Sequence, residues 1–131
     1  MGDDQATNRS GALFSETDIY GKIIFANDNF CEISQFKWTE LVGQPHNIVR
    51  HPDMPAKLFK LLWDAIERGV VFRGIIKNKA KDGSHYWVRA TIMPVYDHQS
   101  KITKYIGGTH HISNDKVAEE VYKEQAKRLQ L

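Results

Sequence analysis

The chain has 131 residues, which fits one domain, and its net charge of +2 gives no electrostatic reason to expect a nucleic-acid or anionic-membrane partner. The single cysteine, Cys31, excludes an internal disulfide framework and a cysteine-rich metal centre. Apolar runs are only a few residues long, so the sequence predicts neither a transmembrane span nor a signal peptide. It does combine three tryptophans, five tyrosines and six phenylalanines with six histidines.

The first half of the chain predicts a polar arm followed by a hairpin and short helices. Residues 1–12 are polar and rich in Gly, Ser, Asn and Asp, which is typical of a loose N-terminal arm or cap. Turn-forming residues between two β-branched and aromatic runs favour a hairpin, and an Asn-Asp pair then caps a helix. The predicted elements are strands over 13–17 and 22–26, a helix from Asn27 or Asp28 to about Gln35, and a helical turn over 39–42 closed by Gly43.

A proline-rich segment, residues 44–55, separates this half from the second. Its prolines fix backbone angles and rule out a long helix. Beyond Pro55, apolar residues recur with helical spacing as far as Arg68, and Gly69 ends the pattern. The remaining predicted elements are antiparallel strands over 72–79, 85–95 and 102–112, and a charged helix from Asn114 to Leu131. One seam of this helix suits either a signal relay or a dimer contact; it comprises Ala118, Val121, Tyr122, Gln125, Ala126 and Leu129.

This order of elements predicts an α+β fold, in which helices cover one face of a five-stranded antiparallel sheet and a C-terminal helix follows. Such an arrangement can hold a concave pocket between sheet and helices. The GxSxG, HExxH, CxxC, P-loop and GxGxxG motifs are all absent. We therefore predict a binding module without catalytic residues or a metal site, and not an enzyme.

The histidines raise the question of haem. His46 and His51 lie on the proline-rich segment, and either could serve as an axial haem ligand. His110 and His111 are adjacent on a predicted strand, so their side chains point to opposite faces and cannot chelate one ion together. We favour the simpler interpretation that these are surface or hydrogen-bonded histidines.

The strongest local pattern lies on the first strand of the second half. Alternation places Phe72, Gly74, Ile76 and Asn78 on one face, so an otherwise apolar face ends in an amide. An asparagine side chain donates and accepts at once, which suits the adjacent N–H and C=O groups of a flavin or pterin ring. The residues alone equally allow Asn78 to open the following turn and bond its backbone.

The sequence Arg50-His51-Pro52-Asp53 places a cation, a titratable ring and a carboxylate on stiff backbone. The Arg50 guanidinium could pair with a phosphate or a ring carbonyl. In a plainer interpretation Arg50 and Asp53 form a surface pair, and Asp53 caps the helix that follows Pro55. We favour the cap for Asp53 and leave Arg50 open.

Taken together, these residues resemble the PAS family. Its usual sequence features are matched by Ala26-Asn27-Asp28-Asn29-Phe30, Leu41-Val42-Gly43, Lys81-Asp82-Gly83 with Tyr86-Trp87-Val88, and Pro94-Val95 with Ile112-Ser113. The stretches 43–55, 74–78 and 85–90 resemble more closely the N-terminal PAS domain of bacterial aerotaxis receptors. The resemblance covers about residues 13–115.

The resemblance implies a PAS sensor over 13–113 that binds FAD non-covalently, and a helix or linker over 114–131 that leads to a downstream signalling module. It implies redox or oxygen-linked input for aerotaxis or chemotaxis by a cytoplasmic homodimer, with any membrane anchor beyond Leu131. The positions it implies for flavin binding or pocket integrity are Asn27, Arg50, His51, Asp53 and Asn78, with Phe59, Trp63, Phe72 and Trp87 as aromatic candidates around the ring. Phe72 stands where these receptors commonly carry tryptophan, which keeps an apolar wall but removes an indole N–H.

FAD rests on this resemblance alone, because no phosphate-cradling motif accompanies it, so FMN stays open. Three alternatives also remain: a haem sensor, a receptor for a small organic acid paired to Arg50, and a cofactor-free PAS dimerisation module. Flavin photosensors of the light-oxygen-voltage kind need a reactive cysteine in the segment over the ring. Cys31 precedes that segment, so a light-driven cysteinyl adduct is not expected.

Overall fold

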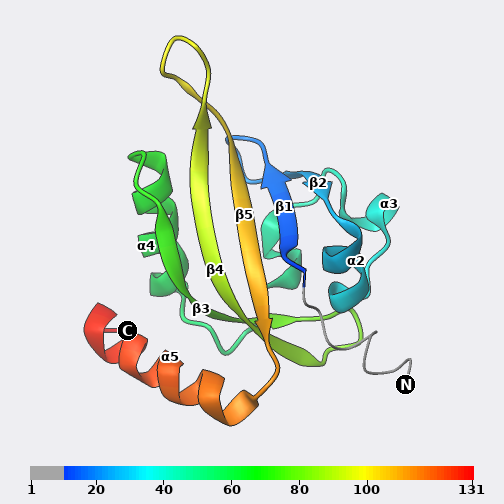
Figure 1. The fold of residues 1–131 in the computed structure, drawn as a ribbon, viewed down its shortest axis with the longest axis vertical. Coiled ribbons are helices and arrows are strands. Elements are labelled where there is room, and N and C mark those ends of the chain that lie inside the picture. Colours follow the sequence, from blue (N-terminus) through cyan, green and yellow to red (C-terminus); the bar gives the residue numbers. More distant parts are fainter. Residues whose placement is uncertain (1–10) are drawn as a thin grey trace.

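The computed structural model describes residues 11–131, so the predicted N-terminal arm lies outside the described residues except for Gly11 and Ala12. Five strands form one antiparallel sheet in the order β2-β1-β5-β4-β3 (Figure 1). The predicted α+β fold is confirmed, and each predicted element lies within two residues of the observed one. The elements are β1 (Leu13–Thr17), β2 (Ile23–Ala26), α2 (Asp28–Ser34), α3 (Trp38–Leu41), the 3-10 helix η1 (His46–Val49), α4 (Ala56–Glu67), β3 (Phe72–Lys79), β4 (His85–Tyr96), β5 (Ile102–Ile112) and α5 (Asp115–Leu129).

The sheet combines the N-terminal hairpin with the predicted meander of β3, β4 and β5. The hairpin joins the meander through β1, which pairs with both β2 and β5. Across β3 and β4 the register places Ile76 opposite Val88 and Asn78 opposite Tyr86. Since facing residues of an antiparallel pair share one side of the sheet, Ile76, Asn78 and Val88 point toward the same layer.

Helices α2, α3 and α4 cover one face of this sheet, with α4 beside β3 and the shorter helices beside β2 (Figure 1). In α4 the buried residues Leu58, Leu62 and Ile66 recur at helical spacing and pack in the core. The helix follows Pro55 at the N-cap position with no side-chain cap, so the interpretation of Asp53 as its cap is wrong. Proline already sets the backbone angle for helix entry, and its missing N–H costs nothing there.

Residues 43–54, which we call the crossing segment, run from one edge of the sheet to the other. Its start lies along β2, where the Gly43 N–H donates to the Ile23 C=O at 2.8 Å. Its end lies along β3, where the backbones of Arg50 and Asn78 form an isolated antiparallel bridge and Met54 Sδ accepts from the Lys77 amide at 3.5 Å. One segment therefore contacts both edge strands and passes over the sheet between them.

Helix α5 packs against β3 and carries the C-terminus along the end of the sheet away from α3 (Figure 1). Asn114 caps it, and its side-chain oxygen accepts from the Val117 amide at 3.1 Å. Gln125 is buried and bonds both backbone groups of Ile75, accepting from its N–H at 2.6 Å and donating to its C=O at 2.9 Å. The seam expected to serve a relay or a dimer is thus used within the chain. Among residues 11–131, no helix is both long enough and apolar enough to cross a bilayer.

Candidate functional site

A cavity of about 520 Å³ lies between the covered face of the sheet and the helical layer. The sheet contributes Ser15, Thr17, Ile76, Asn78, Val88, Ala90, Ile92 and Tyr105 to its lining. The crossing segment contributes Pro45, His46, Asn47, Val49 and Arg50, and α4 contributes Phe59, Leu62, Trp63 and Ile66. Lys60, Asp64 and Thr109 also line it, so an apolar and aromatic majority is combined with a polar minority, as in many small-molecule sites, and the volume falls in the usual range.

Arg50 and Asn78 meet at this cavity although 28 positions separate them in the sequence. The backbone bridge between these two residues fixes the end of the crossing segment against β3. The Arg50 guanidinium carbon lies 4.1 Å from the centroid of the Phe59 ring, a cation–π contact that orients the side chain. A fixed cation and an amide are thus held side by side at one wall.

Asn78 lies inside β3, one residue before its end, and its side chain lines the cavity. The alternative in which Asn78 opens the turn is therefore wrong. Opposite it stands Tyr86, whose pKa is raised by burial while the neighbouring Asn78 amide acts in the opposite direction. The phenol is neutral at physiological pH, and the amide lies within reach of a ligand's donor and acceptor groups.

The aromatic wall comes from α4. Phe59 and Trp63 both line the cavity, where the sequence analysis expected aromatic groups. The Trp63 ring packs edge-on against Tyr105 of β5, with centroids 5.6 Å apart and planes at 90°. Tyr105 was missed because its strand gave no local signal, and only the pairing of β5 between β1 and β4 brings it under α4.

His46 is the histidine of the cavity lining, and it is half-buried. Its Nε2 lies 3.2 Å from Ser15 Oγ, and its ring packs edge-on against Phe30 at 5.8 Å. Burial lowers the pKa of His46, so the imidazole is neutral at physiological pH. Nearby, the Thr17 hydroxyl is buried at the cavity wall without a hydrogen-bond partner among the described residues. Ser15 and Thr17 were missed because a β-strand pattern does not distinguish structural from ligand-facing hydroxyls.

Two predicted aromatic candidates, Phe72 and Trp87, lie outside the cavity lining. Trp87 neighbours Val88 on β4, and because successive side chains alternate, Trp87 points to the other face of the sheet. There it is 3% exposed and packs against Tyr122 of α5 at 5.5 Å. Phe72 is buried on the cavity side of β3, but its ring lies over Gly74 and does not reach the lining. The expectation that these two residues wall a ligand ring is thus corrected.

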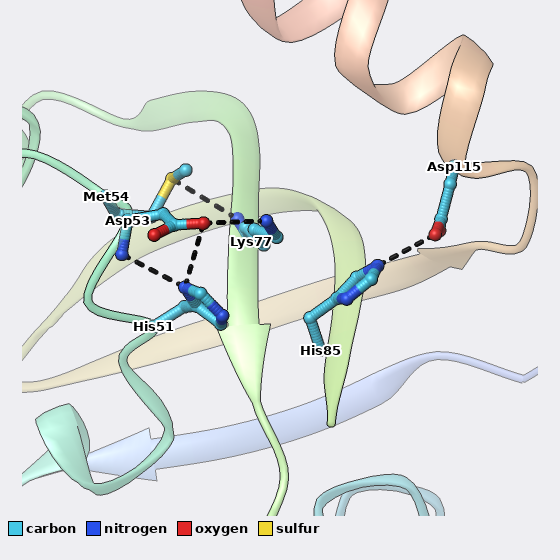
Figure 2. Close-up of polar contacts among 6 residues, drawn as sticks. All are labelled: His51, Asp53, Met54, Lys77, His85 and Asp115. Atoms are coloured by element: carbon cyan, nitrogen blue, oxygen red, sulfur yellow. Dashed lines mark hydrogen bonds and ion pairs between the residues drawn. The ribbon is translucent and has the colours of Figure 1, made fainter. Parts of the chain in front are cut away.

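His51 and Asp53 are not among the cavity-lining residues and belong to a polar cluster beside β3 (Figure 2). The Asp53 carboxylate pairs with Lys77 Nζ at 3.0 Å and lies 3.7 Å from His51 Nδ1, which accepts from the Asp53 amide at 3.0 Å. Hydrogen bonding to Lys77 lowers the pKa of Asp53, and burial lowers that of His51. His85 joins the cluster 6.5 Å from His51, and its Nε2 lies 2.8 Å from Asp115 at the start of α5. These groups fix the shape of the crossing segment and do not line the cavity.

Asn27 is likewise away from the cavity lining. Its Oδ1 accepts from the amides of Phe30 at 3.0 Å and Phe14 at 3.1 Å, and its Nδ2 donates to the Ala12 carbonyl at 3.0 Å. One side chain therefore caps α2 and fastens it to β1. Flavin binding and pocket integrity were the two roles expected of Asn27, and its contacts are those of a residue that holds the scaffold together.

Cys31 lies on α2, packed against the core and absent from the cavity lining. Burial raises the pKa of its thiol, so the residue is a poor nucleophile. Over the described range 11–131, no three or more His, Cys, Asp or Glu side chains are placed to hold a metal ion.

A five-stranded antiparallel sheet with a ligand-sized cavity under short helices and one longer helix defines a PAS-type module. The chain belongs to the PAS family, whose PAS fold matches residues 23–109. It is 42% identical to the aerotaxis receptor of Escherichia coli K12 over 85% of this chain and 22% of that protein. It is also 29% identical to a biofilm dispersion protein of Pseudomonas aeruginosa, over 70% of this chain and 22% of that protein. The chain thus spans about a fifth of these two relatives.

Solved structures agree on the fold. A light-oxygen-voltage domain studied with a flavin analogue superimposes with a TM-score of 0.81 at 19% identity, covering 98% of this chain and 96% of that one. A PAS domain from Colwellia psychrerythraea gives a TM-score of 0.72 at 22% identity, covering 86% of this chain and 95% of that one. Such distant neighbours show the arrangement of strands and helices alone.

Proposed function

We propose that this PAS domain binds a flavin, FAD, non-covalently in the cavity and reports redox or oxygen-linked energy state to a downstream signalling module. The observation that carries the proposal is the meeting of Arg50 and Asn78 at one wall of the cavity, bridged through their backbones. The 42% identity to an aerotaxis receptor supports the same assignment, as does the fold shared with a domain studied through a flavin analogue.

The chemistry of the lining fits a flavin ring. The ring is flat and apolar on its faces, which suits Phe59 and Trp63, and its edge carries N–H and C=O groups that an asparagine amide can pair with both ways. The unpartnered Thr17 hydroxyl offers a further donor or acceptor. A flavin supplies electron transfer when bound, and the protein supplies its position and electrostatic surroundings.

The predicted site residues other than Asn27, Phe72 and Trp87 each have a role in this proposal. Arg50 and Asn78 contact the cofactor and Phe59 and Trp63 enclose it, whereas His51 and Asp53 hold the crossing segment that carries Arg50. Neutral His46 lines the same cavity but has its Nε2 beside Ser15, which favours a hydrogen-bonding role over haem ligation. With Cys31 outside the lining, the proposed input is redox and not a cysteinyl photoadduct.

The proposed output passes through α5. The cluster that holds the crossing segment reaches Asp115 through His85 (Figure 2). Helix α5 is also bonded to β3 through Gln125. A change of charge at the cavity wall that shifts Arg50 or Asn78 would act on these contacts, and α5 would then favour one position over another. We extend the proposal to a homodimeric cytoplasmic sensor, whose oligomeric state is measurable by light scattering.

The absorption spectrum of the purified chain tests the cofactor. Flavin bands near ~450 nm support the proposal, a Soret band near ~400 nm replaces it with a haem sensor, and a colourless chain that reconstitutes with neither refutes both. Chromatography of the released cofactor distinguishes FAD from FMN.

Asn78→Ala should lower flavin occupancy with the circular dichroism unchanged, whereas Asn29→Ala, outside the cavity, should retain it. Full occupancy in Asn78→Ala would place the ring edge elsewhere.

A further inference from the structure

A second concavity of about 510 Å³ lies between α5 and the β3–β4 surface, separate from the proposed flavin cavity. Its strand wall includes Arg73 and Arg89, and its helix wall includes Val121, Glu124 and Arg128. We call it the arginine groove. Neither the PAS assignment nor the proposed cofactor gives it a role.

The charges of the groove are unbalanced. Arg73, Arg89 and Arg128 are all exposed, and within the part of the chain that the structure describes none of them forms an ion pair. Glu124 supplies the only carboxylate among the lining residues, against three guanidinium groups. Lys60, Lys81 and Lys104 each have an acidic partner, whereas in the described part of the chain the three guanidinium groups that meet around this depression have none.

The geometry brings these cations together from two elements. Arg89 pairs with Ile75 in the β3–β4 register, so Arg73 is its diagonal neighbour on the same side of the sheet, with Cα atoms about 7–8 Å apart in such pairs. Arg128 approaches from α5, which the two Gln125–Ile75 hydrogen bonds hold against β3. The two walls of the groove are therefore held together by buried hydrogen bonds.

We propose that the arginine groove binds a small polyanion, a molecule with two or more carboxylate or phosphate groups. The planar fork of a guanidinium pairs with either group through two hydrogen bonds, and the walls offer such forks from opposite sides. The volume matches a small molecule and not an extended chain. A ligand that contacts Arg89 and Arg128 together bridges sheet and helix. Its binding therefore stabilises, by mass action, the state in which α5 is packed against the sheet.

Two probes test this site on the 131-residue chain at constant ionic strength: citrate for carboxylates and inorganic pyrophosphate for phosphates. Titration is followed by isothermal calorimetry and by the NMR shifts of the Ile75 and Gln125 amides, with slower hydrogen exchange at Ile75 expected on binding. Arg89→Gln and Arg128→Gln should each weaken binding roughly tenfold, since each removes a charge-assisted pair. Lys123→Gln, an exposed change on α5 outside the groove, is the matched control.

Saturable binding of citrate, of pyrophosphate or of both, weakened by the arginine variants and not by the lysine control, supports the proposal and names the anionic group. Equal weakening in Lys123→Gln shows charge screening and overturns it. So does the absence of a saturable shift with either probe. If a hexaglutamate peptide binds and neither small anion does, the proposal is also overturned, because the groove would then be a protein-docking surface. Flavin occupancy is measured in each variant, and its retention keeps this test separate from the proposed cofactor.

Discussion

Replacing Asn27 with alanine tests whether this residue acts on the scaffold and not on the ligand. The side chain makes three hydrogen bonds, to the amides of Phe30 and Phe14 and to the Ala12 carbonyl. Alanine removes all three and leaves the start of α2 uncapped and one β1 amide without its partner. No atom of the cavity wall is removed, because Asn27 is not among the lining residues.

The expected loss follows from these bonds. An N-cap contributes about 0.5–2 kcal/mol, and a buried amide left unpaired costs about 1–3 kcal/mol. All three bonds are only partly buried, so water recovers some of this energy, and we expect a total loss of about 2–4 kcal/mol. With a urea m-value of about 2 kcal/mol/M, the unfolding midpoint falls by about 1–2 M.

Urea unfolding followed by circular dichroism measures the shift, with two comparison variants. Asn29→Ala removes one long contact to the Ala12 carbonyl, at 3.4 Å, and should lower stability by at most about 0.5 kcal/mol. Asn27→Asp keeps both acceptor bonds and should fall between the other two. Equal losses in Asn27→Ala and Asn29→Ala would refute the reasoning. A stable Asn27→Ala that no longer binds flavin would also refute it, since it would show a direct role at the cofactor.

Three further predictions follow from the other contacts. Trp63→Leu should lower flavin occupancy, whereas Trp87→Leu should retain it, and loss of absorbance in the second variant would contradict the assignment of faces. Burial lowers the pKa of His46 below 6.5, so the neutral imidazole contributes to stability above that pH and the contribution is lost as the pH falls. Between about pH 7 and pH 5 the melting temperature should therefore drop less in His46→Gln than in the wild type. His98→Gln is the exposed control. Gln125→Leu should lower unfolding free energy by about 1–3 kcal/mol and speed hydrogen exchange at its partner amide; unchanged exchange would show that α5 is held by other contacts.

The elements of this fold were predictable because their ends carry strong local signals. Asn27 and Asn114 cap helices, and Gly43, Gly69 and Gly83 all adopt positive φ values of 83–92°, which favour glycine at turns and helix ends. Strand alternation likewise placed Asn78 on a largely apolar face, and the structure puts that face in the cavity. Each of these signals depends on residues within a few positions of one another.

The site was only partly predictable because its contacts join distant segments. Asp53 was expected to cap the following helix, yet it pairs with Lys77, 24 positions away. Trp87 is an aromatic residue one position from a cavity residue, and only the orientation of β4 relative to α4 decides which face it takes. Gln125 was noted on a helical seam, but its bonds to Ile75 depend on where α5 returns to the sheet.

The crossing segment, residues 43–54, also determines how this sheet behaves toward other molecules. An unpaired edge strand is a template for another strand, and both edges here are at least partly occupied, β2 by the backbone near Gly43 and β3 by Arg50, Met54 and Gln125. Because the same twelve residues form one wall of the cavity, the wall and the cover over both sheet edges are one continuous piece of backbone, and a displacement of the wall is also a displacement at the edges.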